Sequence, residues 1–346
     1  MKTFLSRLIF VLPALFIFPL NGNSQDIHFS QFSETPLLLN PALAGIFSGD
    51  VRVQGVFRNQ WNSVTVPFQT TSLNAEYKLP VGHGDDFLTI GGAILYDKAG
   101  TVALTSTSLL PVLNYHKSLS SDRNMYLSAG FSAGIVQRRF DESKVTTNDQ
   151  FNGMADDPTL NSGENFAENN LSYFDGGAGL SFNTQVGSNP EDNMYLGIAY
   201  DHFNQSAKIS FFNNSQVQIE PKWVYSAGYK NTLSDLSYIT FYANYSVQGV
   251  YTEAIGGMLY SMKLDNYTDD PRYTISGGGF LRWGDAFIPM LKLEMKPMSF
   301  ALSYDVNVSA LKASNQSRGG FELSLSYQGF VSHEKATNEP IRCPRF

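Results

Sequence analysis

Residues 321–328, FELSLSYQ, alternate between apolar and polar side chains without a break. In a β-strand the four apolar residues share one face and the four polar residues share the other, because successive side chains point to opposite sides. The same period of two recurs in 299–309, 285–296 and 68–79. Soluble sandwiches also alternate, but their exposed faces carry more charge than these segments do. The alternation therefore favours a membrane barrel with a lipid face and a lumen face.

The whole chain repeats this pattern between clusters of turn residues. Strands are expected at 51–62, 68–79, 87–97, 102–117, 124–138, 171–184, 193–203, 221–231, 237–248, 252–264, 272–283, 285–296, 299–309 and 319–330. An even number of strands, each long enough to cross a bilayer, is typical of bacterial outer-membrane barrels. We predict an all-β protein: a transmembrane antiparallel outer-membrane β-barrel of about 14 strands. Strand 319–330 should pair with 51–62, which leaves no unpaired edge in lipid.

The lengths of the connections support this strand count. The two longest connections, 139–170 and 204–220, follow the fifth and seventh expected strands. Both termini of such a barrel lie on the periplasmic side, so connections after odd-numbered strands face outward. Outer-membrane barrels have longer outer loops and short periplasmic turns. We therefore expect these two connections at the cell surface.

Composition narrows the class of function. Charged residues make up 16% of the chain and aromatic residues 14%, and the net charge is −7. An acidic chain with few Lys and Arg residues speaks against a nucleic-acid partner. Cys343 is the single cysteine, so the chain cannot form an internal disulfide.

The ends of the chain differ in pattern from the middle. Residues 1–24 have a positive start, an apolar run and small residues before Gln25, which predicts a signal peptide. Residues 25–50 are expected to be an irregular N-terminal segment, 51–330 the barrel, and 331–346 a periplasmic C-terminal tail. We expect both flanking segments to be available to periplasmic partners.

Charges of both signs occupy the strand positions that alternate with apolar residues. The inward charges are expected at Arg52, Arg58, Glu76, Lys78, Arg272, Arg282, Lys292, Glu294, Lys296, Asp305 and Glu322. An ion-selective pore would carry clusters of one sign, whereas buried charges of mixed sign must pair. We therefore favour a plugged lumen over an open pore. Pairing of the first and last strands should place Glu322 near Arg52 or Arg58, with Asp305 one strand away.

Catalytic and metal-binding patterns are weak. The five histidines lack a matching Ser or Cys motif. The best constellation joins Asp201-His202 to Asp156-Asp157, which would suit a hydrolase at the barrel rim, but a solvated acidic loop explains the same residues. Residues 152–164 lack the ligand spacing of a calcium-binding EF-hand. We predict no enzyme activity, no cofactor and no metal site.

Four short elements in order resemble one known family. They are FSQF at 29–32, NPALAG at 40–45, RNQW at 58–61 and CPRF at 343–346. With these elements the chain resembles the PorP/SprF family of type IX secretion membrane proteins along nearly all of residues 25–346. The corresponding positions in this sequence are Asn40, Pro41, Ala42, Gly45, Arg58, Asn59, Gln60, Trp61, Tyr304, Asp305, Cys343 and Pro344. The family has no active site to carry over, so the resemblance implies structural roles for them.

The resemblance also implies partners. Family members serve type IX secretion in the outer membrane, and some are implicated in the export or surface attachment of large cargo proteins, including gliding adhesins. We expect contacts with a secreted cargo protein, other type IX secretion components and outer-membrane lipid. The alternative is a channel for small hydrophobic molecules, which an apolar lumen or a lateral gap would favour.

The long outer connection 139–170 is the candidate for a partner-binding loop. Its large apolar residues are Phe140, Phe151, Met154, Leu160 and Phe166. They either pack onto the mouth of the barrel or anchor a secreted partner, since aromatic anchors dominate many binding interfaces. The sequence leaves both interpretations open.

Overall fold

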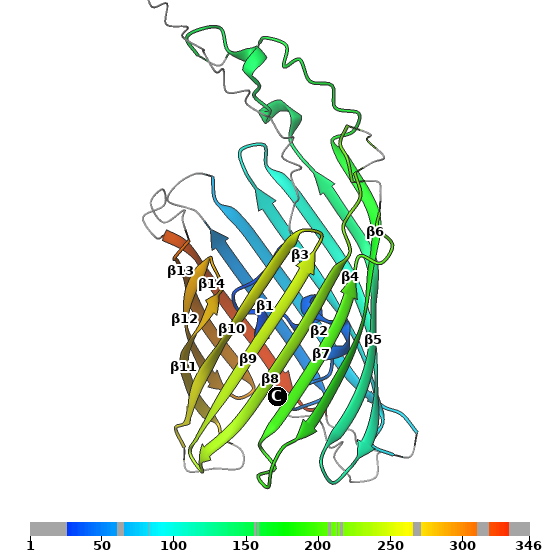
Figure 1. The fold of residues 1–346 in the computed structure, drawn as a ribbon, viewed down its shortest axis with the longest axis vertical. Helices are drawn as coiled ribbons and strands as arrows, with labels where there is room; N and C mark the ends of the chain where they lie inside the picture. Colours follow the sequence, from blue (N-terminus) through cyan, green and yellow to red (C-terminus); the bar gives the residue numbers. More distant parts are fainter. Residues whose placement is uncertain are drawn as a thin grey trace, which may run out of the picture.

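The computed structural model describes residues 26–60, 66–82, 84–155, 157, 159–206, 209–212, 214, 217–265, 271–309 and 318–331. Within these residues, fourteen antiparallel strands form a closed barrel (Figure 1). Each strand pairs with its neighbours in sequence, and β14 pairs with β1 to close the ring. Closure gives every strand two partners, so no edge is left for lipid to meet.

The strands are β1 (Val51–Gln60), β2 (Phe68–Pro80), β3 (Phe87–Ala99), β4 (Leu104–Ser120), β5 (Met125–Arg139), β6 (Asn170–Gln185), β7 (Asn193–Asp201), β8 (Lys222–Ser234), β9 (Ser237–Gln248), β10 (Tyr251–Lys263), β11 (Tyr273–Arg282), β12 (Ala286–Met295), β13 (Met298–Asn307) and β14 (Arg318–Gly329). The strands predicted from the alternation are confirmed, with ends that shift by at most three residues. The predicted pairing of the last strand with the first is also confirmed.

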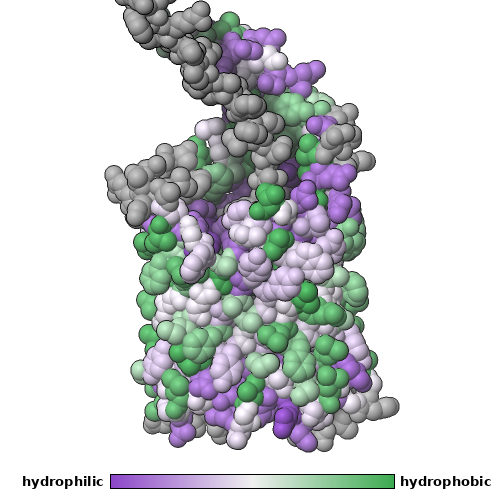
Figure 2. All heavy atoms as spheres, viewed as in Figure 1, coloured by the Kyte–Doolittle hydropathy of each residue, from purple (hydrophilic) through white to green (hydrophobic). Residues whose placement is uncertain are grey.

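The wall has an apolar outer face and a polar inner face. In β14, Leu323 and Leu325 are 47% and 44% exposed on the outside, while Glu322 and Ser324, which alternate with them, are buried. The space-filling view shows apolar residues around the wall and hydrophilic residues gathered toward its two ends (Figure 2). This pattern is that of an outer-membrane barrel, whose band of apolar residues faces the acyl chains. Among the described residues, no helix has the length and apolar character needed to cross a membrane.

The long connections between β5 and β6 and between β7 and β8 lie at one end of the barrel (Figure 1). We assign this end as the outer end, because short turns face the periplasm in such barrels. Chain segment 26–50, here called the plug segment, lies inside the ring of strands (Figure 1). It carries a 3₁₀ turn η1 (Phe32–Glu34), a single helical turn α1 (Pro36–Leu39) and a second 3₁₀ turn η2 (Pro41–Leu43).

The position of the plug segment corrects one expectation. It is irregular, as the prolines suggested, but it is not available to periplasmic partners, because its residues 29–32 and 40–47 are buried in the lumen. The physical reason is the lumen wall itself. The backbone amides of Ser30 and Gln31 bind a buried carboxylate of that wall, and the Phe32 side chain packs into an apolar patch on it.

Two of the charges expected in the lumen lie elsewhere. Arg272 and Lys296 are exposed in the turns that precede β11 and follow β12. The predicted strands included one residue too many at these two ends. Both residues belong to turns, where side chains no longer alternate between the two faces of the sheet. Trp61, Cys343 and Pro344 lie outside the described residues.

Candidate functional site in the filled lumen and the outer loops

The seam between the last strands and the first carries a buried network of four charges. Arg58 in β1 lies opposite Glu322 in β14, and its Nη1 is 2.5 Å from Glu322 Oε1. Arg58 Nη2 also contacts Asp305 Oδ2 of β13 at 3.1 Å, and Arg282 Nη1 of β11 reaches the same oxygen at 3.3 Å. All four side chains are at most 4% exposed. Each charge therefore faces an opposite one, which a low-dielectric site requires.

The plug segment binds to this network through its FSQF element. The backbone amides of Ser30 and Gln31 donate to the two carboxylate oxygens of Glu322, each at 2.7 Å. Ser30 Oγ donates to Asp305 Oδ1 at 2.6 Å and accepts from Arg58 Nη1 at 3.0 Å. Gln31 Nε2 reaches Ser303 Oγ at 3.0 Å and the Glu322 carbonyl at 2.9 Å. The wall thus recognises both the main chain and the side chains of this element.

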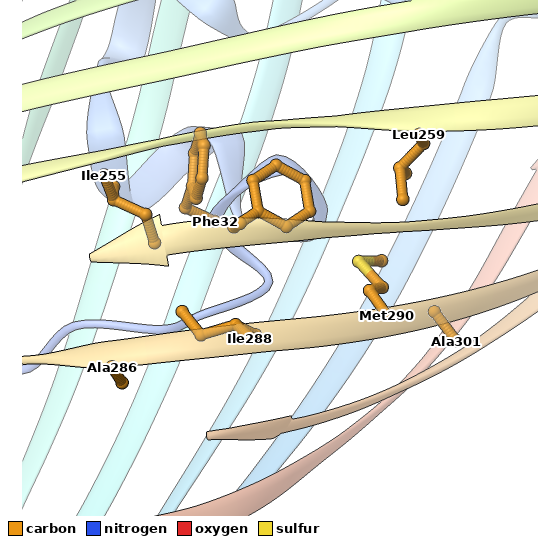
Figure 3. Packing of buried hydrophobic residues seen from close by; sticks show 8 residues of the cluster. Phe32, Ile255, Leu259, Ala286, Ile288, Met290 and Ala301 are labelled. Atoms are coloured by element: carbon orange, nitrogen blue, oxygen red, sulfur yellow. The ribbon is translucent and has the colours of Figure 1, made fainter. Parts of the chain in front are cut away.

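Phe32, the last residue of the element, enters an apolar patch of the wall (Figure 3). The patch consists of Ile255, Leu259, Phe280, Ala286, Ile288, Met290 and Ala301 from β10 to β13. Phe32 is 3% exposed, and its ring meets those of Phe280 and Tyr242 edge-on at 5.5 and 6.3 Å. Edge-to-face contacts add to the free energy gained by burial. Two residues further on, Glu34 Oε1 accepts from Lys292 Nζ of β12 at 2.7 Å.

The NPALAG element packs its backbone against the opposite side of the wall. Asn40 donates to the carbonyls of Leu180 and Ile198, both at 3.2 Å, and its own Oδ1 caps η2 by accepting from the Ala42 amide. Asn114 Nδ2 of β4 donates to the Ala42 and Ala44 carbonyls at 2.9 and 2.8 Å.

This approach needs glycine in the wall. A Cβ on Gly130 of β5 would collide with the backbone of Pro41 and Ala42, and one on Gly179 of β6 would collide with Asn40 Oδ1. Gly130 and Gly179 are direct register partners in neighbouring strands. Together they leave the shallow surface on which η2 lies.

The periplasmic end of the plug segment is held by charges around an aromatic ring. Gly45, which has a φ of +85°, donates its amide to Glu76 Oε2 at 2.7 Å. Arg52 Nη2 contacts Glu76 Oε1 at 2.7 Å. The fully buried Phe47 ring lies 4.5 Å from Arg52 Cζ and 4.1 Å from Lys78 Nζ, so it makes two cation–π contacts. Of the lumen pairs predicted from the sequence, Arg58, Asp305 and Glu322 come together, whereas Arg52 pairs with Glu76.

The outer end of the plug segment is held at the barrel rim. Asp26 Oδ2 is 2.7 Å from His202 Nε2 and 3.4 Å from Lys222 Nζ, and His202 Nδ1 is 2.8 Å from Asp175 Oδ1. Burial acts against a charged imidazole, but the Asp26 and Asp175 carboxylates outweigh it and raise the pKa of His202 to about 10. Burial also opposes the Asp26 charge, yet Lys222 and His202 hold the pKa of Asp26 well below its usual value. Asp26 and His202 therefore form an ion pair at neutral pH.

These contacts show how the residues of the hydrolase alternative are bound. His202 is bound on both ring nitrogens by Asp26 and Asp175 and not by the loop carboxylates. Asp157 instead accepts from the amide and hydroxyl of Thr159 within its own loop, and Asp156 lies outside the described residues. In the part of the chain that the structure describes, no group of three or more His, Cys, Asp and Glu side chains could hold a metal ion.

The apolar residues of the long outer loop divide into two groups. The Phe140 ring lies 4.8 Å from the Phe166 ring of its own loop and 4.8 Å from the Phe211 ring of the neighbouring outer connection, and Phe166 packs against Phe212 at 5.2 Å. The Ala167 amide also donates to the Phe211 carbonyl at 3.0 Å. These contacts fasten the two outer loops to each other.

The second group lies at the tip of the loop. Phe151, Met154 and Leu160 are 53%, 94% and 40% exposed there. Nearby, a capping box at Thr147 and Gln150 holds the turn η4 (Asn148–Gln150), so the tip has local structure of its own. The tip therefore presents three large apolar side chains at the outer end.

A closed barrel with an apolar outer band and long outer loops is an outer-membrane protein, and the filled lumen distinguishes it from an open porin. The chain belongs to the family described as type IX secretion system membrane protein PorP/SprF, whose model matches residues 21–327. It is therefore an outer-membrane component of the type IX secretion system. A comparison with curated proteins finds no match.

Solved structures with a similar outline include two toluene transporters and a FadL homologue. The Ralstonia pickettii toluene transporter TbuX is 10% identical with a TM-score of 0.48, over 85% of this chain and 92% of that one. The P. putida toluene transporter TodX is 10% identical with a TM-score of 0.44, over 85% and 93% of the two chains. A Pseudomonas aeruginosa FadL homologue is 10% identical with a TM-score of 0.46, over 84% and 92%.

Sequence reasoning missed two parts of this site. It did not place the plug segment in the lumen, and it did not find the latch of Asp26, His202, Asp175 and Lys222. A signal for the first was present in the sequence. Segment 26–50 mixes apolar and polar residues and directly precedes the first strand, so it is short enough to fold back into the lumen.

Proposed function

We propose that this type IX secretion component binds a specific secreted cargo protein at its outer loops and supports the export or surface attachment of that cargo. The observation that carries the proposal is the exposed tip of Phe151, Met154 and Leu160 on a loop that is fastened to its neighbour. A few well-packed anchor residues, often aromatic, contribute most of the free energy at protein interfaces. A fastened loop also loses little conformational entropy on binding. The proposal involves no catalytic step.

The competing function is a channel for small hydrophobic molecules. The apolar patch from β10 to β13 is the lumen feature that such a channel would use, but Phe32 occupies it. Elsewhere the plug segment contacts the wall in three ways. It binds charged side chains such as Glu322 and Lys292, it hydrogen-bonds through Asn40 and to Asn114, and it packs two smaller apolar clusters around Leu37 and Leu43. These observations favour binding of a macromolecule at the outer end over passage of a solute through the lumen.

The test is a triple replacement of Phe151, Met154 and Leu160 by Ser in cells that make the native cargo. We expect the barrel to assemble and the amount of cargo on intact cells to fall at least about tenfold, because three interface anchors are removed. Val250→Ser is the matched control, since it removes a residue that is 80% exposed in the outer turn between β9 and β10. Normal display by the triple variant would contradict docking at this loop.

Deletion of most of 139–170 extends the same test to the transport alternative. Surface display should be lost while uptake of a hydrophobic solute is unchanged. Loss of uptake together with normal display would favour the channel instead.

A further inference from the structure

We propose that the lumen wall from β10 to β14 is a peptide-binding site, and that residues 29–32 of the plug segment are an internal ligand which a segment of the secreted partner replaces. The partner segment would be an extended peptide that carries an aromatic side chain just after two free backbone amides. That the replacing chain is the cargo rests on the function proposed above. The existence of the peptide-binding site does not depend on that function.

The first observation is the form of recognition. Glu322 binds two consecutive backbone amides, those of Ser30 and Gln31, and the apolar patch binds the side chain of Phe32 that follows. Main-chain hydrogen bonds combined with a side-chain pocket are the usual way in which proteins bind linear peptides. Any chain with the same spacing of amides and aromatic ring would meet the same groups.

The second observation is that the barrel is complete without the plug segment. The ladder is closed by strand pairs alone, and Arg58 pairs with Glu322 and Asp305 whether or not Ser30 is present. Arg282 likewise pairs with Asp305. Removal of the plug segment would therefore leave Arg58, Arg282, Asp305 and Glu322 paired with one another and uncover a pocket, which is the behaviour of a receptor and its ligand.

The third observation concerns the apolar patch itself. Ile288 and Met290 lie near Phe32 (Figure 3), and together with Phe280 of the same cluster they are at most 2% exposed with Phe32 in place. A contiguous apolar surface on an otherwise polar wall is a binding surface when uncovered. The shape matches an aromatic ring, because Phe280 and Tyr242 meet the Phe32 ring at 76° and 86°.

The fourth observation is the route by which a competitor would arrive. The plug segment is tethered to β1 at its periplasmic end, and its outer end is held by the Asp26 ion pairs at the rim. A tethered ligand acts at an effective concentration on the order of millimolar. A free peptide competes poorly against it, whereas a cargo already bound at the outer loops gains a comparable effective concentration at the mouth of the lumen.

The test uses the purified full chain in detergent and the labelled peptide DIHFSQFSETP, which copies residues 26–36. Phe32→Ala weakens the internal ligand and opens the pocket. We expect the peptide to bind this variant at least about tenfold more tightly than the wild type. The same peptide with Ala at the position of Phe32 should not bind. Equal binding of the two peptides, or no binding of either, would overturn the proposal.

A second variant and a second measurement locate the site. Ala286→Leu, added to Phe32→Ala, fills the pocket and should abolish peptide binding, whereas Ser276→Ala on the lumen face of β11 should leave it unchanged. In the Phe32→Ala variant, excess peptide should expose the plug segment to chymotrypsin at Phe29. Unchanged protection would again contradict replacement. Cargo display by the loop variants is measured separately, so this proposal and the proposed function can fail independently.

Discussion

Glu322 receives contacts from both the wall and the plug segment. It accepts from Arg58 on the neighbouring strand and from the amides of Ser30 and Gln31 in the lumen, and it is 1% exposed. A carboxylate buried to this degree is stable only when its charge and its lone pairs are all satisfied. The same side chain therefore joins the closing seam of the barrel to the segment inside it.

Removal of one member of this pair should cost more than removal of both. We expect Glu322→Gln to destabilise the barrel by about 3–5 kcal/mol, because the Arg58 charge loses its closest partner in a buried site. The double variant Arg58→Met with Glu322→Met should lose less, since Arg282 still pairs with Asp305. The measurement is the temperature at which the folded barrel loses its characteristic mobility on unboiled gels. A double variant less stable than the single one would contradict this account.

His202 makes the outer latch dependent on pH. Its pKa is raised in the folded protein from 6.5 to about 10. Its contribution to stability is therefore complete below pH 6.5 and is lost as the pH rises through about 10. We expect the outer end of the plug segment to become accessible to protease between pH 8 and about pH 10.5. The variant His202→Gln should show no such dependence, and an unchanged pH profile in that variant would exclude His202 as the cause.

The closest packing between elements is the contact of η2 with β5 and β6. Backbone lies against backbone there because Gly130 and Gly179 carry no side chains. Such a contact fixes the position of the plug segment more narrowly than contacts between flexible side chains would, since backbone atoms have no rotamers to adjust. The register of two wall strands thus sets the depth at which NPALAG lies.

Gly130→Ala tests this packing. The added methyl group would collide with the Pro41 and Ala42 backbone, so we expect a loss of about 1–3 kcal/mol, confined to the plug segment. Gly55→Ala in β1 is the control, because its nearest neighbour would be a backbone oxygen at 3.9 Å, an ordinary contact. Hydrogen exchange of the Ala42 and Ala44 amides reports the effect. Equal exchange in the two variants would show that the contact is looser than described.

The barrel as a whole acts as a closed wall around a covered binding surface. The wall is built by strand pairing alone, and the plug segment fills the lumen by many separate contacts from the rim to the periplasmic end. The outer loops lie above that lumen on one side (Figure 1). This arrangement brings a docking loop and a peptide site to the same end of the molecule.

Single-channel conductance measures how completely the plug segment fills the lumen. We expect low conductance for the wild type in planar bilayers. Deletion of 26–47 should open a conducting pore, because the wall remains closed without it. Deletion of most of 139–170 is the control and should leave the conductance low. A wild type that conducts as well as the deletion variant would mean that the segment does not block the lumen.

The sequence alone determined the barrel, its strand number and its closure. These features follow from the period of two, which sorts side chains between lipid and lumen at every strand, as 321–328 shows most clearly. It also indicated that Arg58, Asp305 and Glu322 would meet, because the seam pairs the first strand with the last and unpaired charge cannot lie in either lipid or a closed lumen. Within the wall, the errors lay at strand ends, as at Arg272 and Lys296.

Only the tertiary structure decided what fills the lumen. The side chains of residues 26–50 show no regular alternation from which their position could be predicted. Their contacts are with residues that are far away in sequence, because Ser30 binds Glu322 and Asp26 binds His202. Alternation acts locally along one strand, whereas these contacts depend on the curvature that closes the sheet and brings all fourteen strands around one space. Local side-chain pattern therefore fixed the wall, and the closed geometry of the wall fixed the position of the segment inside it.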